Sequence, residues 1–334
     1  MLKYASTFVT GLDSIVVRQM KEVLPKINIL EVYDGLVLYE YNGNILDLKK
    51  LFFVNNTYKV HRGFNGDTSF NSMVKQITKG KSKKYNYNTL NRQNFRVRFS
   101  KENEFCKVDN QTVHCIENHI LKNSSLRINR LNPDTEFWFI KRTDVQMYCQ
   151  LITKRIFNEK TLNKGELRPE FAYLFANCIN TNKNSVIWEP FSGYGAIPVQ
   201  IAKHFRFSKL YVSDISKKSI ENLKKNKFLK NKKIEIFCCD INKQTFIKEK
   251  SINYIITDPP WGIFENIDNI KEFYSIMLDS FQNVLIQDGK ALILTAKKIE
   301  FEETVNNSDF IIVKKYNTLV NGKKASIYEI ALKN

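Results

Sequence analysis

Hydrophobic and polar positions alternate in short runs along the first half of the chain, as in strands that bury one face. Such runs lie at residues 30–33, 35–40, 95–99 and 135–140, and helical spacing appears at residues 11–24, 44–53 and 109–121. The polar residues 80–93 predict an exposed loop, and residues 144–160 predict a connecting helix. The first half therefore predicts an α+β arrangement, with two small domains joined near residue 60.

From about residue 165 the pattern changes to strands that alternate with helices. The expected strands are residues 185–188, 209–213, 233–238, 254–257 and 291–295, and the expected helices lie near residues 195–205, 217–228 and 268–287. This alternation predicts a buried parallel sheet with right-handed crossovers. Two later runs, residues 310–316 and 325–331, flank Asn321-Gly322, which indicates an antiparallel hairpin. The expected fold class is α/β, with a parallel sheet closed by that hairpin.

Length and composition narrow the possibilities further. A chain of 334 residues favours two or three domains. No apolar run is long enough to cross a bilayer, and the first residues lack the order of a signal peptide, so a soluble, cytoplasmic protein is expected. The six cysteines show no Cys-x-x-Cys spacing and the four histidines are scattered, so we expect reduced cysteines and no metal site.

The formal net charge is +18, and its distribution points to a polyanionic partner. Residues 51–100 hold ten basic side chains and one acidic side chain, with aromatic residues between them, which favours RNA over a merely solvated face. The expected RNA-binding residues are Lys75, Lys79, Lys81, Lys83, Lys84, Arg92, Arg96 and Arg98. A second lysine cluster lies in residues 217–233, and there the sequence leaves a solvated face equally open.

A glycine-containing loop follows the first strand of the parallel sheet. Gly193 and Gly195 allow a tight turn and a close approach to a ligand at the carboxyl edge of the sheet. The third glycine of the dinucleotide fingerprint is absent, which disfavours NAD. Asp214 ends the second strand, where a carboxylate can accept ribose hydroxyl groups or, alternatively, cap the next helix. Asp240 ends the third strand, where it can contact adenine or simply form a turn.

The sequence Asp258-Pro259-Pro260-Trp261 directly follows the fourth strand. Two prolines cannot extend a central strand, so they predict a rigid loop with free carbonyl groups. An exocyclic amine of a nucleobase is a poor nucleophile because its lone pair is delocalised into the ring. If Asp258 and the Pro259 carbonyl accept its two hydrogens, the lone pair can point at a methyl donor, while Trp261 stacks on the base. This pattern predicts methyl transfer to a base amino group.

Together these motifs resemble, in order and spacing, those of class I amino-methyltransferases with a Rossmann-like fold. The resemblance implies S-adenosylmethionine as cofactor and the Asp-Pro-Pro-Trp loop as catalytic. The implied cofactor-binding residues are Glu189, Ser192, Gly193 and Gly195 for the methionine moiety, Asp214 for the ribose, Asp240 for the adenine, and Asp258. The family more often has Asp at the position of Glu189, Cys at that of Ser192, and Tyr or Phe at that of Trp261. Tryptophan there is also found in adenine-N6 enzymes.

The first half is similar to the subgroup that carries a THUMP RNA-binding domain, on residues 95–99 and on Asn132-Pro133-Asp134 leading into residues 137–140. The segment 165–172 looks like the part that closes over the cofactor in that subgroup. The resemblance implies a ferredoxin-like domain at 1–58, a THUMP domain at 59–150, a linker helix at 151–164 and a methyltransferase domain at 165–334.

From this resemblance we expect a tRNA guanine-N2 methyltransferase that grips the acceptor end of tRNA and requires no protein partner. Adenine-N6 methylation of DNA or RNA, guanine-N2 methylation of rRNA, and a non-catalytic RNA-binding protein are the alternatives. The THUMP-like half argues against DNA, and the complete motifs argue against loss of activity.

Overall fold

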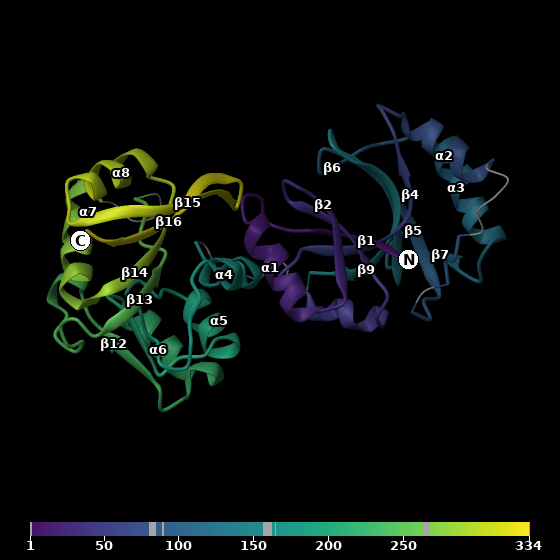
Figure 1. Ribbon diagram of the computed structural model, residues 1–334. Helices are drawn as coiled ribbons and strands as arrows, with labels where there is room; N and C mark the ends of the chain where they lie inside the picture. Colours follow the sequence, from purple (N-terminus) through teal and green to yellow (C-terminus); the bar gives the residue numbers. More distant parts are fainter. Residues whose placement is uncertain are drawn as a thin grey trace. The chain divides into compact units, whose positions relative to one another are not determined.

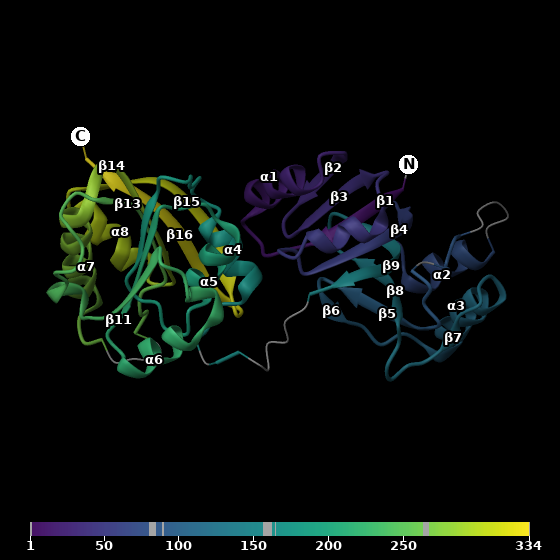
Figure 2. The same ribbon diagram turned by 90° about the horizontal axis from the view of Figure 1, so that it is seen from below.

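The computed structural model describes residues 2–79, 85–88, 90–155, 162–163, 165–262 and 267–333. Its contacts divide the chain into two compact units, shown in Figures 1 and 2. The N-terminal unit comprises Met1–Phe8 and Val17–Arg155, and the C-terminal unit comprises Val9–Val16 and Ile156–Asn334. Within the described residues, no helix combines the length and the hydropathy that crossing a membrane requires.

One mixed sheet forms the N-terminal unit. Its strand order is β2-β3-β1-β4-β9-β8-β5-β6, and β7 pairs with β5. The bounds are β1 (Lys3–Thr7), β2 (Ile27–Tyr33), β3 (Leu36–Tyr41), β4 (Asn56–Phe64), β5 (Asn94–Lys101), β6 (Glu104–Phe105), β7 (Arg127–Ile128), β8 (Thr135–Lys141) and β9 (Gln146–Lys154). β4 pairs with both β1 and β9, so the sheet runs unbroken past residue 58, where the sequence predicts a domain boundary. That boundary stays a prediction.

Helices of this unit bury one apolar face each. They are α1 (Asp13–Val23), which belongs to this unit from Val17 onward, α2 (Phe70–Thr78) and α3 (Asn110–Lys122). A 3-10 helix η1 (Ile45–Lys50) takes the place of the longer helix expected at 44–53. The Ser69 and Asp109 side chains cap α2 and α3, because each accepts a bond from a first-turn amide. Apolar residues of α2 and α3 share one core with Phe95 and Phe137 of the sheet.

The expected connecting helix at 144–160 is wrong for residues up to 154, and with it the first residues of the linker helix at 151–164. β9 occupies Gln146–Lys154 and pairs with β4 on one side and β8 on the other. Burial of five consecutive residues from Gln146 hides the period of two that identifies a half-exposed strand. Residues 156–161 and 164 lie outside the described residues.

The polar stretch 80–93 is only partly an exposed loop. Tyr87 is 1% exposed and belongs to the core under the sheet. Its carbonyl accepts a 3.1 Å bond from Gln150 Nε2, and the neighbouring Asn86 carbonyl accepts a 3.2 Å bond from Lys59 Nζ. Residues 80–84 and 89 lie outside the described residues.

The C-terminal unit has the expected architecture, a Rossmann-like parallel sheet closed by an antiparallel hairpin. The strand order is β12-β11-β10-β13-β14-β16-β15, and only the pairs that involve β16 are antiparallel. The strand bounds are β10 (Val186–Glu189), β11 (Lys209–Asp214), β12 (Ile234–Cys238), β13 (Ile252–Thr257), β14 (Leu285–Thr295), β15 (Phe310–Val320) and β16 (Lys323–Leu332). The helices are α4 (Pro169–Ala176), α5 (Ala196–His204), α6 (Lys217–Lys225), α7 (Ile270–Val284) and α8 (Lys298–Asn306), with 3-10 helices η3 (Lys227–Leu229) and η4 (Ile241–Lys243).

An early segment of the chain belongs to this C-terminal unit. Val9–Val16 groups with it by contacts, although its neighbours on both sides group with the N-terminal unit. Thr318 Oγ1 of β15 donates a 2.9 Å bond to the Thr10 carbonyl. A Cβ atom at Gly11 would lie 1.6 Å from the Asn317 carbonyl oxygen, so only glycine fits at this contact.

Candidate active site

The strand order reverses at β10, which lies between β11 and β13. In open α/β sheets ligands bind beside such a reversal, at the carboxyl ends of the strands. Four sequence-predicted residues end or follow neighbouring strands at this edge: Glu189 ends β10, Asp214 ends β11, Asp240 follows β12 and Asp258 follows β13. The fold therefore brings the predicted cofactor and catalytic motifs to one edge.

Glu189 is a fully buried carboxyl group at the centre of this edge. Its Oε1 accepts a 2.9 Å bond from Thr257 Oγ1 of β13 and a 3.2 Å bond from the Phe191 amide. Oε2 is buried without a hydrogen-bond partner among the described residues. Burial raises the pKa of Glu189 to about 8, so at neutral pH the free group is mostly protonated, and a bound cation would favour its ionised form.

Thr257 is a partner that sequence reasoning missed. The side chain of Glu189 is one carbon longer than the aspartate common in the family, and it contacts the hydroxyl on the neighbouring strand. The only available signal was the position of Thr257 at the end of a predicted strand of the parallel sheet.

The two glycines of the loop after β10 have different roles. Both adopt left-handed backbone conformations, with φ of 49° at Gly193 and 91° at Gly195. A Cβ atom at Gly195 would lie 2.6 Å from Leu223 Cδ2, whereas one at Gly193 would have no neighbour within 4 Å among the residues that the structure describes. Gly195 is therefore required by the packing against α6, and Gly193 borders open space. Ser192 is buried and donates a 3.0 Å bond to the Glu189 carbonyl, which closes the turn.

Asp214 connects the glycine loop to the second strand. Its Oδ2 accepts a 2.7 Å bond from the Gly193 amide, and its Oδ1 accepts a 2.8 Å bond from the Ser216 amide. The N-cap of α6 is Ser216, not Asp214, so the capping alternative does not explain the aspartate. Asp240 caps the short helix η4, which agrees with the turn-forming alternative.

The loop after β13 holds a second carboxyl group, of which one oxygen is buried. The Asp258 side chain is half-buried, and its Oδ1 has no hydrogen-bond partner among the described residues. Burial raises its pKa to about 8, an effect that the Trp261 side chain partly offsets. Trp261 Nε1 donates a 3.1 Å bond to the Leu294 carbonyl of β14, which fixes the indole ring at this edge.

The predicted RNA-binding residues of the N-terminal unit fall into two groups. Lys75 and Lys79 are exposed at the end of α2. The arginines are already engaged: Arg92 donates to the Ile152 carbonyl, Arg96 pairs with Glu136, and the Arg98 guanidinium lies 4.9 Å from the ring centre of Phe105. Lys81, Lys83 and Lys84 lie outside the described residues.

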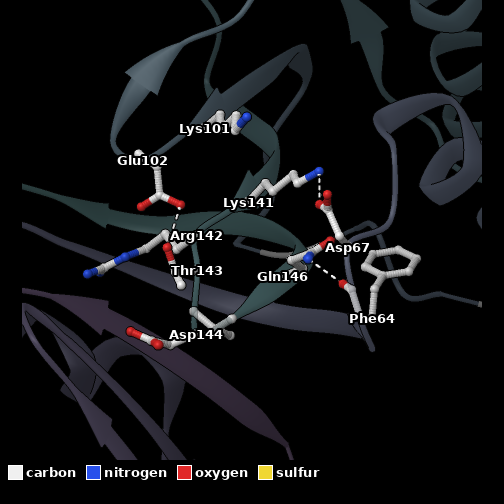
Figure 3. Close-up of a pocket in the computed structure, with 11 residues that line it drawn as sticks. Phe64, Asp67, Lys101, Glu102, Lys141, Arg142, Thr143, Asp144 and Gln146 are labelled. Carbon is white, nitrogen blue, oxygen red and sulfur yellow. Dashed lines mark hydrogen bonds and ion pairs between the residues drawn. The ribbon is translucent and has the colours of Figure 1, made fainter.

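A pocket of about 460 Å³ lies in the N-terminal unit (Figure 3). Lys141 forms an ion pair with Asp67, and Thr143 Oγ1 donates a 3.1 Å bond to Glu102. Three basic and three acidic residues line it in total, so it favours no ligand of one charge. In the described part of the chain, no group of three or more His, Cys, Asp or Glu residues could hold a metal ion.

Comparison with known proteins agrees with this geometry. Residues 158–326 match the protein family described as RMKL-like, methyltransferase domain. None of the curated proteins matches the chain.

Solved structures share the fold over the whole chain. TrmN from Thermus thermophilus is 14% identical, with a TM-score of 0.80, and the match covers 99% of this chain and 100% of that chain. SMU.472, solved in complex with SAH, is 13% identical, with a TM-score of 0.73 and coverage of 100% and 98%. A predicted N6-adenine-specific DNA methylase from Listeria monocytogenes is 13% identical, with a TM-score of 0.72 and coverage of 98% and 95%.

Proposed function

The chain belongs to the RMKL-like methyltransferase domain family, a family of S-adenosylmethionine-dependent methyltransferases, and we propose that it methylates the N2 amino group of guanine in tRNA. The observation that carries the proposal is the Asp258 carboxyl oxygen Oδ1 at the carboxyl edge of the sheet, which is buried and has no hydrogen-bond partner in the described part of the chain and lies beside two prolines and a fixed indole ring. Such a group requires hydrogen-bond donors from a ligand, and an exocyclic amine supplies two.

The residues at the edge fit the cofactor. Glu189 Oε2 is a buried acceptor that the cofactor's ammonium group would satisfy, and Gly193 leaves space for its methionine moiety. Asp214 has further lone pairs for the ribose hydroxyls beyond its two backbone bonds. Ser192 and Asp240 complete the proposed contacts, and Gly195 contributes through the shape of the loop, which its packing against Leu223 fixes. When bound, S-adenosylmethionine supplies an electrophilic methyl group on a positively charged sulfur.

The protein would activate the base by orientation. In the proposed complex the Asp258 carboxylate and the Pro259 carbonyl each accept one hydrogen of the amino group, so that its lone pair turns out of the ring plane. Trp261 would stack on the base, because its indole is held in place by the bond to Leu294. Pro260 keeps the loop from extending β13 further.

Asp258 should make catalysis depend on pH. Only the ionised carboxylate accepts with both oxygens, and its pKa in the free protein is about 8. We therefore expect kcat to fall as the pH is lowered, with a midpoint at or below about 8 because a bound cation favours the ionised form. Measurement of kcat at saturating substrates between pH 5.5 and 9 checks this. A flat profile, or a rate that increases on acidification, would contradict the proposed role, and the residual rate of Asp258→Asn should not vary with pH.

The glycine loop gives a prediction with an internal control. In Gly193→Ala the new methyl group enters space proposed for the cofactor, so S-adenosylmethionine affinity should fall at least about tenfold. The free energy of unfolding should decrease only by the roughly 1–2 kcal/mol that an alanine in the left-handed conformation costs. In Gly195→Ala the methyl group meets Leu223, so the main effect should be a lower melting temperature. Calorimetry and thermal unfolding separate the two outcomes. Normal cofactor affinity in a folded Gly193→Ala protein would place the cofactor elsewhere.

RNA as the substrate is supported by the THUMP-like motifs of the first half and by the likeness to TrmN over the whole chain. Lys75 and Lys79 are the described lysines of the predicted RNA-binding set, and both are exposed. Two observations favour adenine-N6 as a second candidate. Trp261 occupies the aromatic position of the catalytic motif, and the chain shares its fold with the Listeria monocytogenes protein described above.

The proposal is tested by methylation of unmodified tRNA transcripts, followed by mass spectrometry of the nucleosides. We expect N2-methylguanosine that depends on Asp258. N6-methyladenosine would establish the second candidate. Methylation of rRNA fragments or DNA but not of tRNA would contradict the assignment of tRNA as the substrate. If the protein binds S-adenosylmethionine but methylates none of these nucleic acids, both candidate functions are contradicted.

A further inference from the structure

The C-terminal unit carries a strongly basic surface that the proposed cofactor site does not use. Its lysines lie on α6, on η3 and in the turn before β12, and two more cations lie at the end of α5. We call it the α5–α6 basic surface. All ten of its cationic side chains are exposed: Lys203, Arg206, Lys217, Lys218, Lys224, Lys225, Lys227, Lys230, Lys232 and Lys233.

Acidic neighbours do not compensate this surface. Glu221 is the single acidic residue between residues 217 and 233. None of the ten cations has an ion pair within the described part of the chain, whereas other lysines of the unit do, such as Lys209 with Glu235 and Lys290 with Glu329. Mutual repulsion of exposed like charges opposes folding, so the cluster does not stabilise the unit.

The start of α6 adds to this cost. Lys217 and Lys218 occupy its first turn, which contains no acidic residue. The amino end of a helix carries partial positive charge, so cations are unfavourable there and anions are favourable. A bound ligand with negative charge would offset both the repulsion among the lysines and their unfavourable position at the amino end of α6.

An exposed aromatic ring lies within the surface. Phe228 of η3 is 42% exposed, and its ring lies 5.0 Å from Lys203 Nζ and 5.1 Å from Lys227 Nζ. These contacts join α5 to η3, so the cations form one surface in space as well as a run in the sequence. Aromatic rings among cations are typical of RNA-binding surfaces, where bases or riboses contact the ring.

We propose that the α5–α6 basic surface binds the phosphate backbone of the RNA substrate. The proposal rests on the proposed function, and it adds a contact on the C-terminal unit to the one predicted on the N-terminal unit. A membrane is disfavoured, because the apolar residues of α6, Ile220 and Leu223, are buried and cannot enter a lipid layer. The cofactor is disfavoured as the ligand, because it carries positive charge itself.

The experiment compares two full-length variants with the same loss of charge. The test variant is Lys224→Gln, Lys225→Gln, Lys227→Gln and Lys230→Gln. The control variant is Lys183→Gln, Lys243→Gln, Lys248→Gln and Lys324→Gln, four exposed lysines of the same unit outside the surface. Binding of unfractionated tRNA is measured at several salt concentrations, and S-adenosylmethionine binding is measured by calorimetry.

For the test variant we expect RNA affinity to fall at least about tenfold at 0.1 M salt, and the slope of log K against log salt to decrease by up to about 3, since each lost phosphate contact contributes roughly 0.7–0.9. The control variant should change the slope by less than about 1. Cofactor affinity should stay within about twofold of wild type in both variants, which also shows that both fold.

Equal RNA affinity and equal salt slope in the two variants would contradict RNA binding by the α5–α6 basic surface. The proposed function would remain intact, provided that the wild type binds tRNA. Failure of the wild type to bind tRNA would instead overturn the RNA substrate itself. A DNA duplex that binds better than tRNA through these lysines would also overturn the proposal.

Discussion

Asp258→Ala is expected to lower kcat at least about a hundredfold, equivalent to roughly 2.7 kcal/mol of barrier, while S-adenosylmethionine affinity changes by less than about threefold. Oδ1 of this carboxyl group is buried without a hydrogen-bond partner among the described residues, so its removal costs the protein little beyond the interaction with the Trp261 side chain. Its proposed task is to hold the base amino group. Single-turnover kinetics with a tRNA transcript measure this effect, and more than about a tenth of the wild-type rate would remove Asp258 from the mechanism.

The ionised Asp258 carboxylate, which the proposed catalysis requires, should lower the stability of the folded protein. Its folded-state pKa of about 8 lies above the ordinary 3.8, so between these pH values the folded protein binds one more proton than the unfolded chain. Stability is therefore lost as the pH rises through this window. Asp258→Asn keeps the shape and removes this effect, so it should melt a few degrees above wild type at pH 7.5, with no difference below about pH 4. A lower melting temperature at pH 7.5 would contradict the buried-carboxyl description.

Asp214→Ala should weaken S-adenosylmethionine binding by about 10- to 150-fold, which corresponds to roughly 1.5–3 kcal/mol for a charge-assisted hydrogen bond. The substitution removes the proposed acceptor for the ribose hydroxyls. It also frees the Gly193 amide, so the glycine loop loses one of its hydrogen bonds to β11, while the bond from the Ser192 amide to the Ser213 carbonyl remains. Calorimetric titration of the free protein with the cofactor measures the effect.

A control variant, Ser216→Ala, separates the loss of the Asp214 carboxylate from a disturbance of α6. Ser216→Ala removes the N-cap of α6 and should destabilise that helix by about 1 kcal/mol, but it leaves the Asp214 carboxylate in place. Its cofactor affinity should therefore remain within about twofold of wild type. Unchanged affinity in Asp214→Ala would reduce the aspartate to a support for the loop backbone.

Much of the C-terminal unit could be predicted from the sequence because its strands are separated by helices and end at polar residues. The hairpin around Asn321-Gly322 was equally readable, since β15 and β16 pair on both sides of it. The N-terminal unit was harder. β9 is buried along most of its length and mimics a helix, and β4 pairs with strands far away in the sequence, β1 and β9. Long-range pairing of this kind leaves no local pattern.

The candidate site divides in the same way. Motif spacing identified Glu189, Asp214 and Asp258 because each follows a strand of the parallel sheet. It could not identify Thr257 as the partner of Glu189, which depends on the register between β10 and β13. The sequence also does not show which cations already form ion pairs within the protein. Arg96 is predicted to contact RNA, yet it forms an ion pair with Glu136 on the neighbouring strand β8.

The segment Val9–Val16 has a consequence for the order of folding. Its partner residues Asn317 and Thr318 are synthesised about 300 residues later, and the hydrogen bond from Thr318 to Thr10 closes a loop of 308 residues. A contact at such separation forms only after the intervening chain has already folded, because closing a long unstructured loop costs entropy before the contact repays it. During synthesis residues 9–16 therefore reach their native contacts only after Asn317 and Thr318 have been made, so the C-terminal unit cannot be completed before β15 is present.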